Sequence, residues 1–130
     1  MSGKLVDTWE NKLKALFDEI DEELEKRFGS LYNLHPSRAK KGSTSNKEQD
    51  GLFDIGASFS PGFGSEYGRG YVLDVDMMTL DHVPKEVQEH IEEIVVELIR
   101  KKLPVFFPER ELEVKRDGNI FKIIGDLTLL

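Results

Sequence analysis

The chain has 130 residues, the usual size of one domain, of which 38% are hydrophobic and 33% are charged. This composition predicts a water-soluble globular protein of the cytoplasm without membrane contact, because no apolar run approaches the roughly 20 residues that a spanning helix needs. The absence of cysteine excludes disulfides and thiolate chemistry, and the formal net charge of −7 argues against general nucleic-acid binding, which needs a basic surface.

The first predicted element is an amphipathic helix that begins near Leu5 and ends at Phe28. Its apolar residues recur at steps of three and four, which places them on one stripe of a helix. The stripe consists of Leu5, Trp9, Leu13, Leu16, Phe17, Ile20, Leu24 and Phe28. The acidic residues of the second half, Asp21 among them, are predicted to lie mostly on the solvated face.

The second predicted element is a long loop over residues 29–51, which shows no period and contains serine, glycine, asparagine and lysine. Loops of this length in a compact domain tend to be either functional or disordered, and the composition here favours a mobile loop. The loop contains a basic segment, residues 35–47, that has no acidic residue. Its bases are Arg38, Lys40, Lys41 and Lys47.

Two stretches of alternating polarity predict a hairpin. Residues 52–60 and residues 71–78 each alternate apolar with polar side chains, which is the pattern of a half-buried strand. A glycine loop, residues 61–69 (PGFGSEYGR), joins them. If this loop is centred on its middle residue, Phe59 lies opposite Tyr71 in an antiparallel pair.

A second helix is predicted between Pro84 and Pro104. Proline at the start of a helix loses no hydrogen bond, whereas proline further along is expected to end one. Three consecutive bases near the end suit the negative end of the helix dipole. The predicted apolar stripe is Val87, Ile91, Ile94, Val95 and Leu98.

The last predicted element is a second hairpin. Asp117 and Gly118 between two alternating stretches are the signal of a two-residue type I′ turn. In that register Glu113 lies opposite Lys122, which pairs opposite charges across the strands.

These elements follow the order α-β-β-α-β-β, a helix followed by a hairpin, twice. Each hairpin has one apolar face and each helix one apolar stripe. The simplest solution is a four-stranded, largely antiparallel sheet with both helices packed on one face. We therefore predict a single α+β domain over residues 1–130, in which the order of the strands does not follow from the sequence.

Three carboxylates are predicted to share the polar face of the first hairpin, because its register places Asp54 opposite Asp76 and near Asp74. Like charges in this arrangement repel each other unless something neutralises them. Oxygen ligands of this kind suit a hard divalent cation such as Mg²⁺ or Mn²⁺, so the three residues are candidate metal ligands. Basic side chains or solvent could balance an exposed acidic face instead.

A candidate anion-binding site combines the basic segment with the glycine loop. Arginine can bond phosphate through two N–H groups, lysine adds charge, and glycine-rich backbone can present N–H groups to an anion. No phosphate-binding motif has the required spacing. The candidate residues are Arg38, Lys40, Lys41, Arg69, Gly64 and Gly68.

The sequence favours a non-catalytic binding or assembly module that contacts a partner, such as a second copy of itself, through the sheet face or the glycine loop. Apolar residues such as Val72 and Ile120 on the outward face motivate this hypothesis. One alternative is a small metal-dependent enzyme acting on a phosphorylated or anionic substrate. Another is nucleic-acid contact through residues 35–47. No motif indicates a catalytic residue, so none is predicted.

Overall fold

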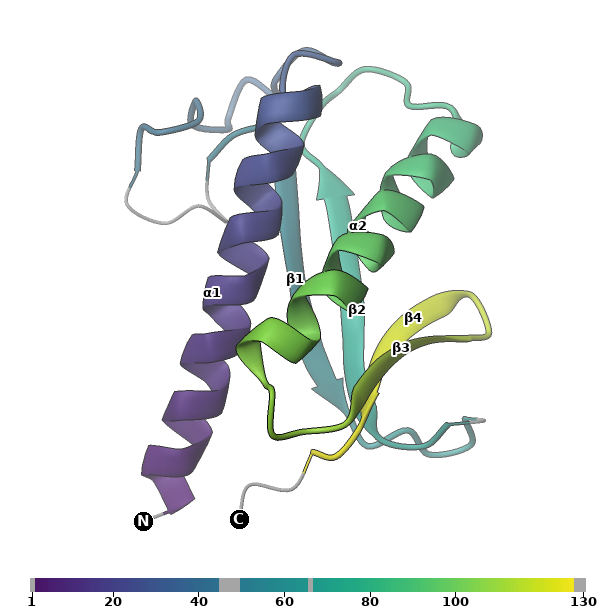
Figure 1. Cartoon of the computed structure of the whole chain (residues 1–130). Helices are drawn as coiled ribbons and strands as arrows, with labels where there is room; N and C mark the ends of the chain where they lie inside the picture. The colour runs from purple at the N-terminus through teal and green to yellow at the C-terminus, as the bar shows by residue number, and fades with distance from the viewer. Residues whose placement is uncertain (1, 45–49, 66, 128–130) are drawn as a thin grey trace.

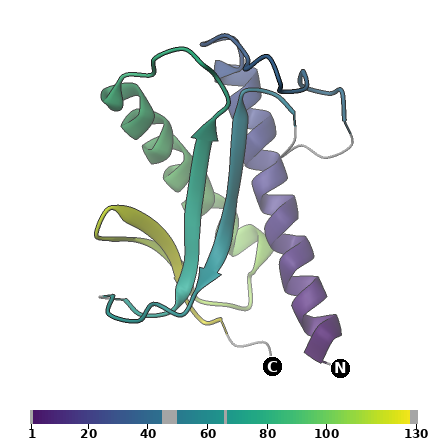
Figure 2. The same cartoon turned by 180° about the vertical axis from the view of Figure 1, so that it is seen from behind.

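The computed structural model describes residues 2–44, 50–65 and 67–127, and it has the predicted order of elements (Figure 1). Both helices cover one face of a four-stranded antiparallel sheet with strand order β1-β2-β4-β3, and the view from behind shows β1 and β2 uncovered by helices (Figure 2). The predicted α+β fold is confirmed. The elements are α1 (Ser2–Phe28), β1 (Phe53–Ser60), β2 (Gly70–Met77), α2 (Lys85–Phe106), β3 (Leu112–Asp117) and β4 (Ile120–Gly125).

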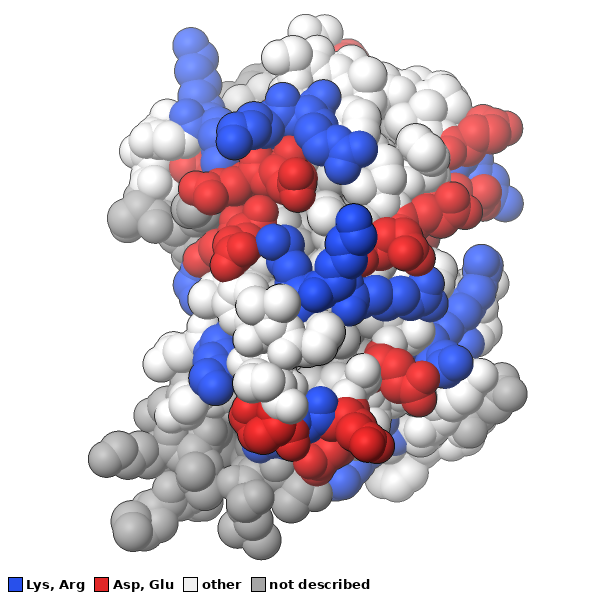
Figure 3. Space-filling model, in the orientation of Figure 1, with Lys and Arg blue, Asp and Glu red and all other residues white. Residues whose placement is uncertain are grey.

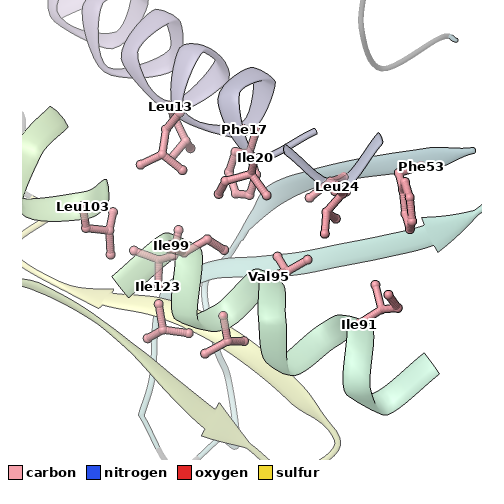
Figure 4. Packing of buried hydrophobic residues seen from close by; sticks show 14 of the residues in the cluster. Leu13, Phe17, Ile20, Leu24, Phe53, Ile91, Val95, Ile99, Leu103 and Ile123 are labelled. Carbon is pink, nitrogen blue, oxygen red and sulfur yellow. The ribbon is translucent and has the colours of Figure 1, made fainter. Parts of the chain in front are cut away.

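The hydrophobic core lies between the two helices and the inner face of the sheet (Figure 4). On α1 the predicted stripe is confirmed from Trp9 to Leu24, where every member is at most 4% exposed. On α2 the predicted members Ile94 and Leu98 are only partly buried, so the helix is rotated relative to the prediction. Its buried residues are Ile91, Val95, Val96, Ile99 and Leu103.

Helix α2 continues past Pro104, where the sequence predicts its end. The helix ends at Phe106, and the backbone N–H of Phe107 donates to the carbonyl oxygen of Leu103 at 2.8 Å. Proline removes one helical hydrogen bond, whereas Leu103 and Phe107 on either side of it are at most 2% exposed and anchor this turn in the core. Tertiary packing therefore overrides the local preference of proline.

The second hairpin turns one residue later than predicted, with Gly118 and Asn119 at its centre. Gly118 has φ +66°, and no described non-glycine residue has positive φ, which are the signs of a type II′ turn rather than type I′. The register shifts by two residues, so Lys122 lies opposite Lys115 and not opposite Glu113 as predicted. A shift of two keeps every side chain on its predicted face of the sheet.

The first hairpin has the predicted register, with Phe59 opposite Tyr71. Strand β4 lies on the other side of β2 but pairs with it only at Tyr71 and Val72. Beyond Val72 the hairpin of β3 and β4 turns away from β2 (Figure 1, Figure 2). The divergence opens a groove between the second half of β2, the first half of β4 and α2, which we call the β2 groove.

Candidate functional site

The glycine loop is fastened to the sheet by Lys122, whose residue surface is 1% exposed. Its Nζ donates to Ser65 Oγ at 2.9 Å, to the carbonyl oxygen of Gly68 at 2.7 Å and to Asp117 Oδ2 at 3.1 Å. An ammonium group has three N–H donors, so these acceptors satisfy all of them. Because a buried charge without such partners is strongly unfavourable, the contacts make a specific tie between the loop and the second hairpin.

The loop itself is folded by short-range hydrogen bonds. The backbone N–H and the hydroxyl of Ser65 both donate to the carbonyl oxygen of Gly62, at 3.0 and 2.8 Å. Gly62, Gly64 and Gly68 all have positive φ, near +75°, and a Cβ at Gly62 would overlap the carbonyl oxygen of Gly68. The glycines therefore allow the positive φ angles that this compact turn structure requires.

Three aromatic side chains are exposed at this end of the first hairpin, and we call Phe59, Phe63 and Tyr67 the aromatic end. Their exposed fractions are 55%, 93% and 40%. The ring of Phe59 contacts Tyr71 edge-on at 5.6 Å between centroids, and Tyr71 in turn contacts Trp9 at 5.5 Å. The backbone N–H of Tyr67 donates to the same Asp117 carboxylate that binds Lys122. The aromatic end is therefore attached to the core and to the hydrogen bonds that Lys122 makes with Ser65, Gly68 and Asp117, which we call the clamp.

Arg38, a predicted anion ligand, is bonded to backbone instead. Its Nε donates to the carbonyl oxygen of Gly51 at 3.0 Å, and its Nη2 donates to those of Asp50 and Phe53 at 3.2 Å each. The guanidinium thus holds the end of the long loop against the start of β1. This is an internal structural role for the side chain.

The structure does not bring the predicted anion-binding residues together. Arg38 lies at the start of β1, whereas the glycine loop with Arg69 follows its far end, roughly 25 Å away along an eight-residue strand. Lys40 and Arg69 are both exposed, and Lys47 lies outside the described residues. The basic segment and the glycine loop are therefore two separate surfaces.

Lys41, whose side chain is 30% exposed, bridges two buried aspartates in an ionic cluster that the sequence does not predict. Its Nζ lies 2.7 Å from Asp21 Oδ1 of α1 and 3.3 Å from Asp50 Oδ1, and both aspartates are at most 2% exposed. Burial raises the pKa of Asp21 to about 6, although Lys41 acts in the opposite direction. Burial alone would raise the pKa of Asp50 as well, but the backbone N–H groups of Thr44 and Gly42 and the Lys41 ammonium together lower it. Asp21 is thus an exception to the prediction that most acidic residues of this helix lie on its solvated face.

The three predicted metal ligands lie where the first hairpin's register places them, with Asp54 opposite Asp76 and Gly56 opposite Asp74. Partial burial, and then the charges of Asp74 and Asp54, raise the pKa of Asp76. Within the described ranges, however, no three or more histidine, aspartate or glutamate side chains are grouped so that they could hold a metal ion. The carboxylates share a region of the sheet without converging on one point.

Asp74 and Asp76 also line the β2 groove, a cavity of about 290 Å³. From α2, Gln88 donates through Nε2 to the carbonyl oxygen of Val75 at 3.1 Å. Burial raises the pKa of Glu92, which also lines the groove, although the Arg116 charge acts against this. The groove depends on which strands are neighbours, and no local pattern in the sequence carries that information.

A family model described as "Uncharacterised protein" matches residues 4–125. The chain belongs to this family. A relative described as "Uncharacterized protein", from Borreliella burgdorferi, is 38% identical over 117 residues, which cover 90% of this chain and 91% of the relative. No solved structure matches the chain. Among the described helices, none has the length and apolar character needed to span a membrane.

Proposed function

We propose that the protein is a non-catalytic binding module that contacts a partner protein through the aromatic end. The observation that carries this proposal is that the glycine loop is anchored by a buried residue and yet exposes an aromatic ring. Lys122 of β4 is buried and donates two hydrogen bonds to the loop and a third to Asp117, while Phe63 of the loop is 93% exposed. Exposing an aromatic ring to water is unfavourable, and burial of the ring against a partner would explain why the folded loop exposes it.

The energetics favour this use of the loop. Burial of a phenylalanine side chain contributes roughly 2 kcal/mol, and aromatic residues are common among the few that dominate binding. Ordering a free loop on binding would offset part of that gain, whereas a clamped loop is already ordered. The expected partner surface is an apolar pocket that accepts Phe63, flanked by contacts to Phe59 and Tyr67.

The alternatives draw less support from the described residues. Arg38 and Lys41, which would neutralise an anionic substrate, bond internal carbonyl and carboxylate oxygens. The face that carries the helices shows acidic and basic side chains interspersed rather than one continuous basic surface (Figure 3). The metal-dependent enzyme and nucleic-acid contact through residues 35–47 stay predictions.

Photo-cross-linking in cells of the source organism tests the proposal. A benzophenone amino acid in place of Phe63 should capture a discrete protein, and the same group in place of Val105, which is 75% exposed on α2, should not. If both positions capture the same set of proteins, or neither captures any, the proposal fails. Sedimentation of the purified protein asks whether the partner is a second copy, since Phe63→Ser should then convert the oligomer to a monomer.

A further inference from the structure

The second half of β2 has an edge that no strand of the described residues covers. β4 pairs with β2 only at Tyr71 and Val72, although β1 pairs with β2 along its whole length. Backbone groups point alternately to the two sides of a strand, so alternate residues over 73–77 direct theirs into the β2 groove. The carbonyl oxygen of Val75 accepts from the side chain of Gln88, where a neighbouring strand would otherwise donate. An edge of this kind is a template for pairing with an additional strand.

The groove has room beside this edge. Its cavity of about 290 Å³ adjoins a second hollow of about 430 Å³, and both are lined by Gln88, Glu92 and Phe121. Leu73 and Phe121 supply apolar surface on opposite sides. An added strand would therefore lie between β2 and the splayed second hairpin, with α2 beneath it.

The charge of the groove selects its occupant. Asp74 and Asp76 project from the outward face of β2, and Glu92 reaches the groove from α2. Within the described part of the chain no basic side chain pairs with these three carboxylates within 4 Å, and Arg116 acts on Glu92 only at longer range. A cationic ligand would relieve the repulsion between Asp74 and Asp76.

We propose that the β2 groove binds an extended segment of a partner protein in which basic and apolar residues alternate, and that this segment pairs with residues 73–77 as an added strand. Side chains of a strand alternate between its two faces. One set of the ligand's side chains therefore lies beside Asp74 and Asp76, which favours lysine or arginine. The other set lies beside Leu73 and Val75, which favours valine or leucine. This site is independent of the aromatic end and of the function proposed for it.

An NMR titration with a capped seven-residue peptide that alternates lysine with valine tests this inference. Amide shifts should be confined to residues 73–77 and the facing part of β4 around Phe121. Combined Asp74→Asn and Asp76→Asn substitutions should weaken binding about a hundredfold, roughly tenfold for each charge-assisted contact. The control Glu23→Gln, which removes an exposed carboxylate of α1, should leave the affinity unchanged.

Two further peptides separate strand addition from simple charge attraction. The same peptide N-methylated at alternate residues keeps its charge but cannot pair along one edge, so it should not bind. A peptide with glutamate in place of lysine should not bind either. Equal binding of the methylated peptide, shifts centred on β3 at Glu113 and Lys115, or no shifts at millimolar peptide would each overturn the proposal.

Discussion

Replacing Asp21 with asparagine should raise the free energy of unfolding at pH 7 and change how that free energy depends on pH. Asp21 is buried against Lys41, and the carboxylates of Asp50 and Glu25 add negative charge nearby. Its Oδ2 has no hydrogen-bond partner within the described part of the chain. Burial of this ionised group is therefore only partly compensated, and the neutral side chain avoids the penalty.

The magnitude follows from the pKa of Asp21, which rises from 3.8 in the unfolded chain to about 6 in the folded protein. This difference corresponds to about 3 kcal/mol. A raised folded pKa means that the native state binds the proton more tightly. The associated stability is fully present below pH 3.8 and is lost as the pH rises through about 6. When the pH is lowered from 7 to 4, the free energy of unfolding of the wild-type protein should therefore rise by up to about 3 kcal/mol relative to that of Asp21→Asn.

Urea denaturation of both proteins at pH 7, 6, 5 and 4 measures this difference, in which the titration of acids outside the Asp21 cluster cancels. The control Glu23→Gln, on the exposed face of the same helix, should follow the wild-type protein at every pH. A difference between wild type and Asp21→Asn that stays constant from pH 7 to pH 4, or that changes in the opposite direction, would show that the folded protein does not raise the pKa of Asp21.

The remaining predictions concern the clamp, the loop and the core. Lys122→Met should lower the free energy of unfolding by about 2 kcal/mol and speed amide exchange in the glycine loop, because it removes three charge-assisted hydrogen bonds. Amide exchange at the wild-type rate would contradict the conclusion that Lys122 fixes the loop. Gly64→Ala should lower the free energy of unfolding, measured in urea, by roughly 1–2 kcal/mol because of its positive φ alone. Gly62→Ala should lower it further, because the new Cβ would also overlap backbone atoms of Gly68. Equal decreases for the two variants would argue against that overlap. Ile99→Ala, at a fully buried site, should cost about 2–5 kcal/mol by the same assay, and the exposed Val105→Ala less than about 0.5.

The order of the elements was predictable because local patterns determine it. The stripe of α1 has a clean period, and the first hairpin alternates around a symmetric loop, so its register follows as well. The second hairpin offers two turn positions, at Asp117 and at Gly118, and both keep the same faces buried. On α2 the run from Ile94 to Ile99 is almost continuously apolar, so the period leaves the orientation of the helix open.

The candidate sites were less predictable because long-range contacts create them. A lysine in an alternating strand indicates a solvated position, and Lys122 is buried only because a loop distant in sequence folds over it. Asp21 likewise resembles the other acids of α1 until Lys41 and Asp50 enclose it. The β2 groove needs the strand order and the divergence of β4, which no stretch of sequence encodes locally.

Cross-linking from position 63, with and without the Lys122 side chain, tests whether the ordered glycine loop presents Phe63 to a partner protein. With Lys122 intact, a benzophenone at position 63 should capture a discrete partner protein. With Lys122→Met, the yield of that product should fall several-fold, because the loop must then be ordered during binding. An equal yield from both proteins, with loop exchange shown to be faster in the variant, would contradict the claim that the clamp presents the aromatic end to a partner.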